Sequence, residues 1–111
     1  MYNKFENVVF LGSDLKLKVS VTDAEKPMNE YNYTIELWSN QSKKVTYSKD
    51  DIEHIILIDG KDDYCIVVLN TEDVGVGRLK CKVTIFVDDE DFPNDIRTEI
   101  VVLDTKINII K

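Results

Sequence analysis

The sequence predicts an all-β protein, an immunoglobulin-like antiparallel β-sandwich of about seven strands. Its 111 residues include a single alanine, Ala24, but many valine, isoleucine, threonine and aromatic residues. Alanine is the strongest helix former, whereas β-branched and aromatic side chains fit the pleated surface of a sheet. Several segments alternate apolar and polar residues, and turn residues separate them at intervals of about ten residues, as in sandwiches.

The clearest strand covers residues 78–87. Gly75 and Gly77 precede it and predict a sharp turn, because glycine adopts backbone conformations that other residues avoid. Successive side chains of a strand point to opposite faces, so the alternation here predicts one buried and one wet face. The expected buried side chains are Leu79, Cys81, Val83 and Ile85.

The other elements follow from the same reasoning. A helical turn is expected at residues 71–73, with Asn70 or Thr71 as its cap. An Asp-Gly pair predicts a hairpin loop at residues 59–63, and polar or proline-bearing loops are expected at 22–30, 48–53 and 88–95. The remaining strands are expected at residues 15–21, 33–38, 45–47, 54–58, 64–69, 96–103 and 107–110.

A chain of this length predicts one domain, with a sandwich at residues 13–111 and an apolar N-terminal arm at residues 1–12. Phe5, Val8 and Phe10 expose too much apolar surface for a free tail, so we expect them to bind a groove. That groove belongs either to an edge of the chain's own sheet, which makes the arm an ordinary first strand, or to a partner protein.

The charge balance excludes several kinds of partner. Fourteen basic and 21 acidic residues give a net charge of −7, and Arg78 and Arg97 are the only arginines. Phosphate binding needs clustered cations, so neither nucleic acid nor an anionic membrane is an expected partner.

No segment has the length of a membrane span or of the apolar region of a secretion signal. Because secretion is not expected, Cys65 and Cys81 are expected as free, buried thiols, and a disulfide between them is the alternative.

Catalysis is not expected. His54 is the only histidine, and a general base needs a positioned partner and a cleft. No Gly-x-Ser-x-Gly motif is present, and Cys65 and Cys81 are distant from His54 in sequence. An edge histidine is the favoured interpretation, and a Cys–His pair assembled by the fold is the alternative.

Two further features suggest binding. Trp38 falls on the polar side of its strand, where it binds a partner or a sugar. The alternative is that it belongs to a second core face or contacts the N-terminal arm. Phe86 also points to the outer side of its strand, so it is a candidate for a two-ring patch with Trp38.

No cofactor is expected, although calcium is an alternative because the loop at 88–95 concentrates carboxylates. The candidate calcium ligands are Asp88, Asp89, Asp91 and Asp95.

Two segments resemble a phage protein family. Residues 15–23, followed by Lys26, Pro27 and Met28, look like the opening strand and D-x-x-K-P turn of that family. Residues 71–83 are similar to its segment of short helical turn, Gly-x-Gly and outgoing strand. The family is the immunoglobulin-like N-terminal domain of phage baseplate upper proteins and of related fibre-anchoring or head-decorating modules. The resemblance covers residues 13–110.

The resemblance implies a non-enzymatic structural protein of the virion, made in the cytoplasm of a host bacterium. Such a subunit would bind capsid, fibre, tail or baseplate proteins and copies of itself. Members of the family usually continue into a fibre, whereas this chain ends at Lys111, which favours a free-standing adaptor or decoration subunit. The expected partner-binding residues are Phe5, Val8, Phe10 and Trp38. The alternative is a carbohydrate- or surface-binding module that uses Trp38 and the acidic loop.

Overall fold

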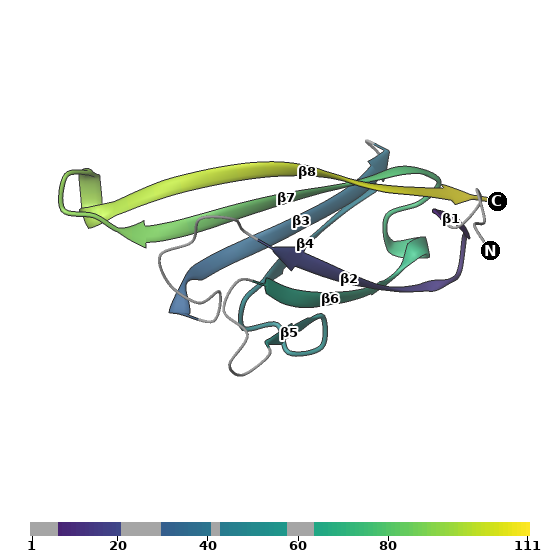
Figure 1. Ribbon diagram of the computed structural model, residues 1–111, viewed down its shortest axis with the longest axis horizontal. Coiled ribbons are helices and arrows are strands. Elements are labelled where there is room, and N and C mark those ends of the chain that lie inside the picture. The colour runs from purple at the N-terminus through teal and green to yellow at the C-terminus, as the bar shows by residue number, and fades with distance from the viewer. Residues whose placement is uncertain (1–6, 21–29, 41–42, 58–63) are drawn as a thin grey trace.

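The computed structural model describes residues 7–20, 30–40, 43–57 and 64–111. Within these ranges, eight strands form two sheets (Figure 1). One sheet has five strands in the order β1-β8-β7-β3-β4, and the other has three in the order β2-β6-β5. The prediction of an all-β, sandwich-like fold is confirmed. The hairpin loop at 59–63 and most of the loop at 22–30 lie outside the described residues.

The described strands agree closely with the predicted segments. A 3-10 turn, η2 (Thr71–Asp73), lies where the helical turn was expected, and the Asn70 side chain caps it by accepting from the Glu72 N–H. A second one, η3 (Pro93–Asp95), lies in the acidic loop. The strands are β1 (Val8–Phe10), β2 (Asp14–Ser20), β3 (Asn32–Asn40), β4 (Lys43–Ser48), β5 (Ile55–Leu57), β6 (Tyr64–Asn70), β7 (Gly77–Asp88) and β8 (Ile96–Ile110).

The core lies between the two sheets. Alternate residues of β3, β6 and β7 are buried, so each of these strands contributes one apolar face. The alternation predicted for β7 is confirmed, and its partner β3 follows the same pattern. Fully buried side chains of the core include Ile35, Leu37, Val67, Leu79, Val83 and Ile109.

The last strand differs from the prediction. Residues 96–103 and 107–110 were expected as separate segments, but they belong to the single strand β8. Its pairing with β7 shifts register between Arg78 and Lys80, and Lys106 has a φ of 62°. Local hydrogen bonds stabilise this bulge: the Thr105 hydroxyl donates to the carbonyl of Leu79 at 2.8 Å, and the N–H of Lys106 donates to Asp104 at 2.8 Å. The strand therefore bends and then resumes its pairing.

The Gly-x-Gly turn before β7 is confirmed. Gly75 and Gly77 have φ values of +83° and +135°, which other residues rarely adopt. A Cβ atom at Gly77 would lie 2.7 Å from the backbone oxygen of Ser39. The turn thus needs glycine both for its conformation and for the close approach of β3.

Candidate protein-docking surfaces

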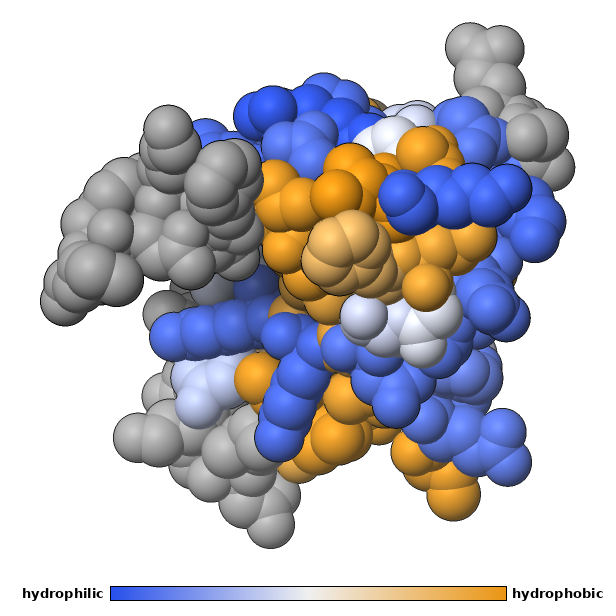
Figure 2. Space-filling model, turned by 90° about the vertical axis from the view of Figure 1, so that its right-hand side faces the viewer, coloured by the Kyte–Doolittle hydropathy of each residue, from blue (hydrophilic) through white to orange (hydrophobic). Residues whose placement is uncertain are grey.

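The outer face of the five-stranded sheet carries an apolar patch at the end of the molecule where β1 and the last residues of β8 lie. Phe10 of β1 is 63% exposed and is the direct cross-strand partner of Ile110 in β8. Val76 is 42% exposed and directly precedes Gly77, the cross-strand partner of Ile109. Figure 2 looks onto this end and shows apolar side chains gathered near its centre, with hydrophilic ones above, below and to the right of them. We call Phe10, Val76 and Ile110 the terminal patch.

A buried threonine holds the terminal patch together. The Thr71 side chain is fully buried, accepts from the Gly12 N–H at 2.7 Å and donates to the carbonyl of Phe10 at 3.4 Å. The Leu11 N–H also donates to the carbonyl of Ile110. The chain leaving β1 is thus bonded to both η2 and β8, and Phe10 is presented on a fixed backbone rather than on a loose tail.

Charged residues occupy the middle of the same outer face. Arg78 donates to both carboxylate oxygens of Asp104, at 2.9 and 2.8 Å, and Lys80 lies 3.3 Å from the same carboxylate. The Lys106 backbone N–H and the Arg78 guanidinium lower the pKa of Asp104 to about 2. Farther along the sheet, Lys44 pairs with Glu36 at 3.4 Å. These pairs separate the terminal patch from the far end of the sheet.

A second apolar area lies on the hairpin formed by β7 and β8. In Figure 1 this hairpin projects beyond the other elements. Phe86 faces Thr98 across the hairpin, and Ile96 and Ile100 lie diagonally to either side of it. These side chains and Val102 are between 37% and 60% exposed. We call Phe86, Ile96, Ile100 and Val102 the hairpin patch.

The predicted partner-binding residues do not form one site. Val8 and Phe10 lie in β1, which pairs in parallel with β8, so this part of the arm is a strand of the chain's own sheet. Phe5 lies outside the described residues. Trp38 is half-buried on β3 opposite Lys44 and Lys80, and the Lys44 ammonium lies 5.7 Å from its ring centre.

Trp38 is distant from the other features proposed to act with it. Phe86 pairs with Asn32, six residues from Trp38 along β3, which corresponds to roughly 20 Å. The two rings therefore do not make a common patch. The acidic loop begins at Asp88, eight residues beyond Lys80 on β7, or roughly 26 Å. A single binding site formed by Trp38 and this loop is not present.

The acidic loop has internal partners for one of its candidate calcium ligands. Asp89 accepts from the Arg97 guanidinium and from the backbone N–H of Asp91. The side chains of Asp88, Asp91 and Asp95 are exposed. In the described part of the chain, no three His, Cys, Asp or Glu side chains gather as a metal site requires.

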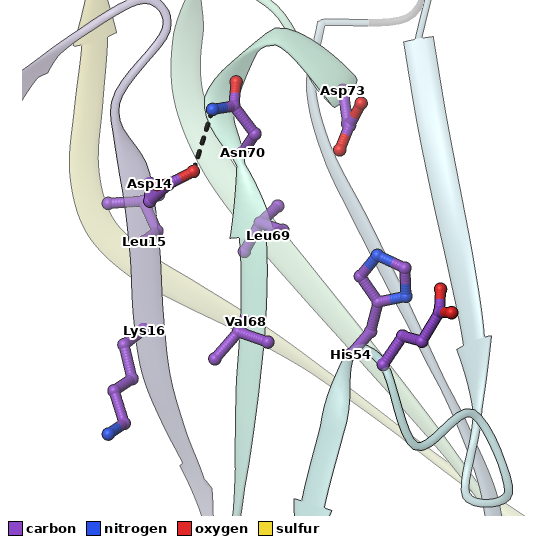
Figure 3. Close-up of a pocket in the computed structure, with 9 residues that line it drawn as sticks. Asp14, Leu15, Lys16, His54, Val68, Leu69, Asn70 and Asp73 are labelled. Carbon is purple, nitrogen blue, oxygen red and sulfur yellow. Dashed lines mark hydrogen bonds between the residues drawn. The ribbon is translucent and has the colours of Figure 1, made fainter.

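A shallow hollow of about 500 Å³ lies beside His54 (Figure 3). The imidazole stacks on Tyr47 with ring centres 4.1 Å apart, and its Nδ1 atom lies 3.2 Å from Asp51. At the rim, the Asn70 amide donates to Asp14. None of the described residues that line the hollow is Ser, Thr or Cys, so the lining offers no hydroxyl or thiol nucleophile.

Both cysteines are free and buried, as predicted. Burial raises the pKa of both thiols, and for Cys81 it reaches about 12, with a further contribution from Cys65. A reactive cysteine instead has a lowered pKa and solvent access. Their position in the core makes them packing residues.

Of the residues in the two patches, the sequence pointed only to Phe10, as a partner-binding residue, and to Phe86, as a second ring beside Trp38. The other members of both patches were not predicted. Val76 follows a glycine and Ile110 is the penultimate residue, so no periodic pattern marked them as surface residues. In residues 96–103 both faces carry apolar side chains, a pattern that usually indicates a strand covered on both sides. The structure leaves this strand uncovered at its projecting end.

Comparison with models of known protein families, with curated proteins and with solved structures finds no match. Over the residues that the structure describes, no helix has the length and apolar character needed to cross a membrane.

Proposed function

We propose that this protein is a non-enzymatic structural subunit of a phage particle, an adaptor or decoration module that binds other virion proteins. The resemblance of residues 15–28 and 71–83 to phage baseplate domains motivates the virion assignment. The observation that carries the docking function is the terminal patch, in which β1, β8 and the turn before β7 present Phe10, Ile110 and Val76 together.

The chemistry of the terminal patch suits a protein partner. Apolar anchors bordered by polar residues are typical of protein interfaces, where aromatic side chains contribute most. Covering an exposed phenylalanine completely contributes up to roughly 1.5–3 kcal/mol. Phe10 is already ordered by its neighbours, so little additional side-chain and backbone freedom is lost on binding.

The test compares tagged variants for co-purification with phage particles on a density gradient. We expect the wild-type chain to band with the particles and the Phe10→Glu variant to remain at the top. The matched control is Ile52→Glu, because Ile52 is 86% exposed and lies in the turn before β5, away from the patch.

Each result has a separate meaning. Absence of the wild-type chain from particles would refute the virion assignment. Equal particle binding by Phe10→Glu and wild type would show that the terminal patch is not the docking surface. Loss of binding by Ile52→Glu alone would move the site to the opposite sheet.

A further inference from the structure

We propose that the partner at the projecting β7–β8 hairpin is a second copy of this chain, paired antiparallel through the open edge of β8 about Thr98. This proposal rests on the proposed function, because it names one partner of a structural subunit. It uses a different surface from the terminal patch, so the two can be tested separately.

The edge of β8 is open over most of its length. Of the described strands, only β7 pairs with residues 96–104, while β1 covers Asn108 to Ile110 on the other side. The Asp89 N–H donates to the carbonyl of Asp95 at the hairpin end, which makes this a hydrogen-bonded pair. Pairs alternate along an antiparallel ladder, so Thr98 and Ile100 direct their N–H and C=O groups away from β7.

The other sheet edges are protected in ways that this one is not. The free edge of β4 carries Lys43 and Lys44, and that of β2 carries Lys16 and Lys18. Charged side chains, lysine above all, discourage edge-to-edge pairing. The strand β5 has only three residues. By contrast, residues 96–105 of β8 contain no lysine, and residues 100–103 carry no charge.

The sequence of this edge is complementary to itself, which is the argument for a second copy. Residues 96–100 read Ile-Arg-Thr-Glu-Ile, so an antiparallel pair centred on Thr98 places Ile96 opposite Ile100, Arg97 opposite Glu99 and Thr98 opposite Thr98. Like apolar pairs, opposite charges and threonine pairs are the cross-strand combinations that stabilise sheets. Two-fold symmetry repeats each favourable pair, giving a closed dimer.

The surroundings of this edge fit the same arrangement. Phe86 lies beside Thr98 on the outer face, so the dimer would gather Phe86, Ile96 and Ile100 from both copies into one apolar cluster. On the inner face Arg97 already lies 3.5 Å from its own Glu99, and the partner's pair would extend this row of charges. The hairpin projects beyond the other elements, which puts its β8 edge within reach of a second copy (Figure 1).

The main test is mutual rescue by charge reversal, measured by sedimentation equilibrium from micromolar to millimolar protein. In a dimer of the Glu99→Lys variant, the Arg97 of each copy lies opposite the introduced lysine of the other copy. We therefore expect the dimer dissociation constant to rise at least about tenfold. Arg97→Glu should act likewise. When the two variants are mixed, both cross-strand pairs of the heterodimer again join opposite charges. A heterodimer is therefore expected at near wild-type affinity.

A second measurement does not depend on Arg97, whose replacement removes its bond to Asp89. Thr98→Cys should cross-link with a short bis-maleimide, because directly opposite residues of such a pair have Cα atoms about 5.5 Å apart. The matched control is Thr46→Cys, on the exposed edge strand β4 of the same sheet. The native thiols are buried and should not react in the folded protein.

Three outcomes overturn the inference: a wild-type chain that stays monomeric at millimolar concentration, a dimer that Glu99→Lys leaves unchanged, or equal cross-linking at positions 98 and 46. Particle binding that depends on Phe10 would survive any of these. Conversely, self-association without particle binding would refute the virion assignment alone.

Discussion

Replacing Thr71 by valine tests whether a single buried hydroxyl joins the chain that leaves β1 to the rest of the sandwich. Valine has nearly the same shape but lacks the oxygen that accepts from the Gly12 N–H at 2.7 Å and donates to the carbonyl of Phe10 at 3.4 Å. Loss of such a bond costs about 1 kcal/mol, and an unpaired buried group costs about 1–3 kcal/mol. Gly12 itself is exposed, so water partly replaces the lost partner.

We therefore expect Thr71→Val to lower the free energy of unfolding by about 1–2 kcal/mol and the Tm by roughly 3–8 °C. Urea titration followed by circular dichroism measures the first quantity. Amide hydrogen exchange at Gly12 supplies a local readout: protection should fall in Thr71→Val and persist in Thr71→Ser, which keeps the hydroxyl. Stability within about 0.3 kcal/mol of wild type, or unchanged protection of Gly12, would refute the reasoning.

Three further predictions follow from the fold. Gly77→Ala should destabilise the protein by at least about 2 kcal/mol in urea titrations, because its Cβ would lie 2.7 Å from the oxygen of Ser39 at a strained φ. Cys65 and Cys81 should react with a thiol reagent at pH 8 only upon unfolding, since burial raises both pKa values; rapid native labelling would contradict this. Burial, with smaller contributions from nearby carboxylates, raises the pKa of Tyr47 from 10.0 to about 12. The contribution of neutral Tyr47 to the free energy of unfolding is therefore complete below pH 10 and is lost as the pH rises towards 12. Urea titrations of wild type and Tyr47→Phe across this pH range should show a smaller loss of stability in the variant.

The strands and their buried faces were predictable because both are set by local rules. The alternation in residues 78–87 marked Leu79, Cys81, Val83 and Ile85 as core residues, and all four are buried. Gly75 and Gly77 marked the turn for the same reason, since positive φ is a local property of glycine. The helical turn at 71–73 was likewise marked by the capping chemistry of Asn70.

The continuity of β8 was not predictable in this way. A polar stretch around Lys106 reads as a break, but bonds from Thr105 to Leu79 and from Lys106 to Asp104 keep the strand paired beyond it. Such bonds depend on which residues of β7 lie opposite, and that register is a long-range property. The same holds for β1, whose parallel pairing with β8 joins residues from nearly opposite ends of the sequence.

By itself the sequence determined the β class, the strands and which side chains share a face. Only the tertiary structure decided which faces stay uncovered, because a strand's alternation names its two sides without saying what packs on either. The terminal patch joins Phe10, Val76 and Ile110 from three distant segments, and the hairpin patch exists because β7 and β8 extend past the opposing sheet. Exposure is a consequence of how segments meet in space, and it is at these uncovered surfaces that we expect the protein to bind its partners.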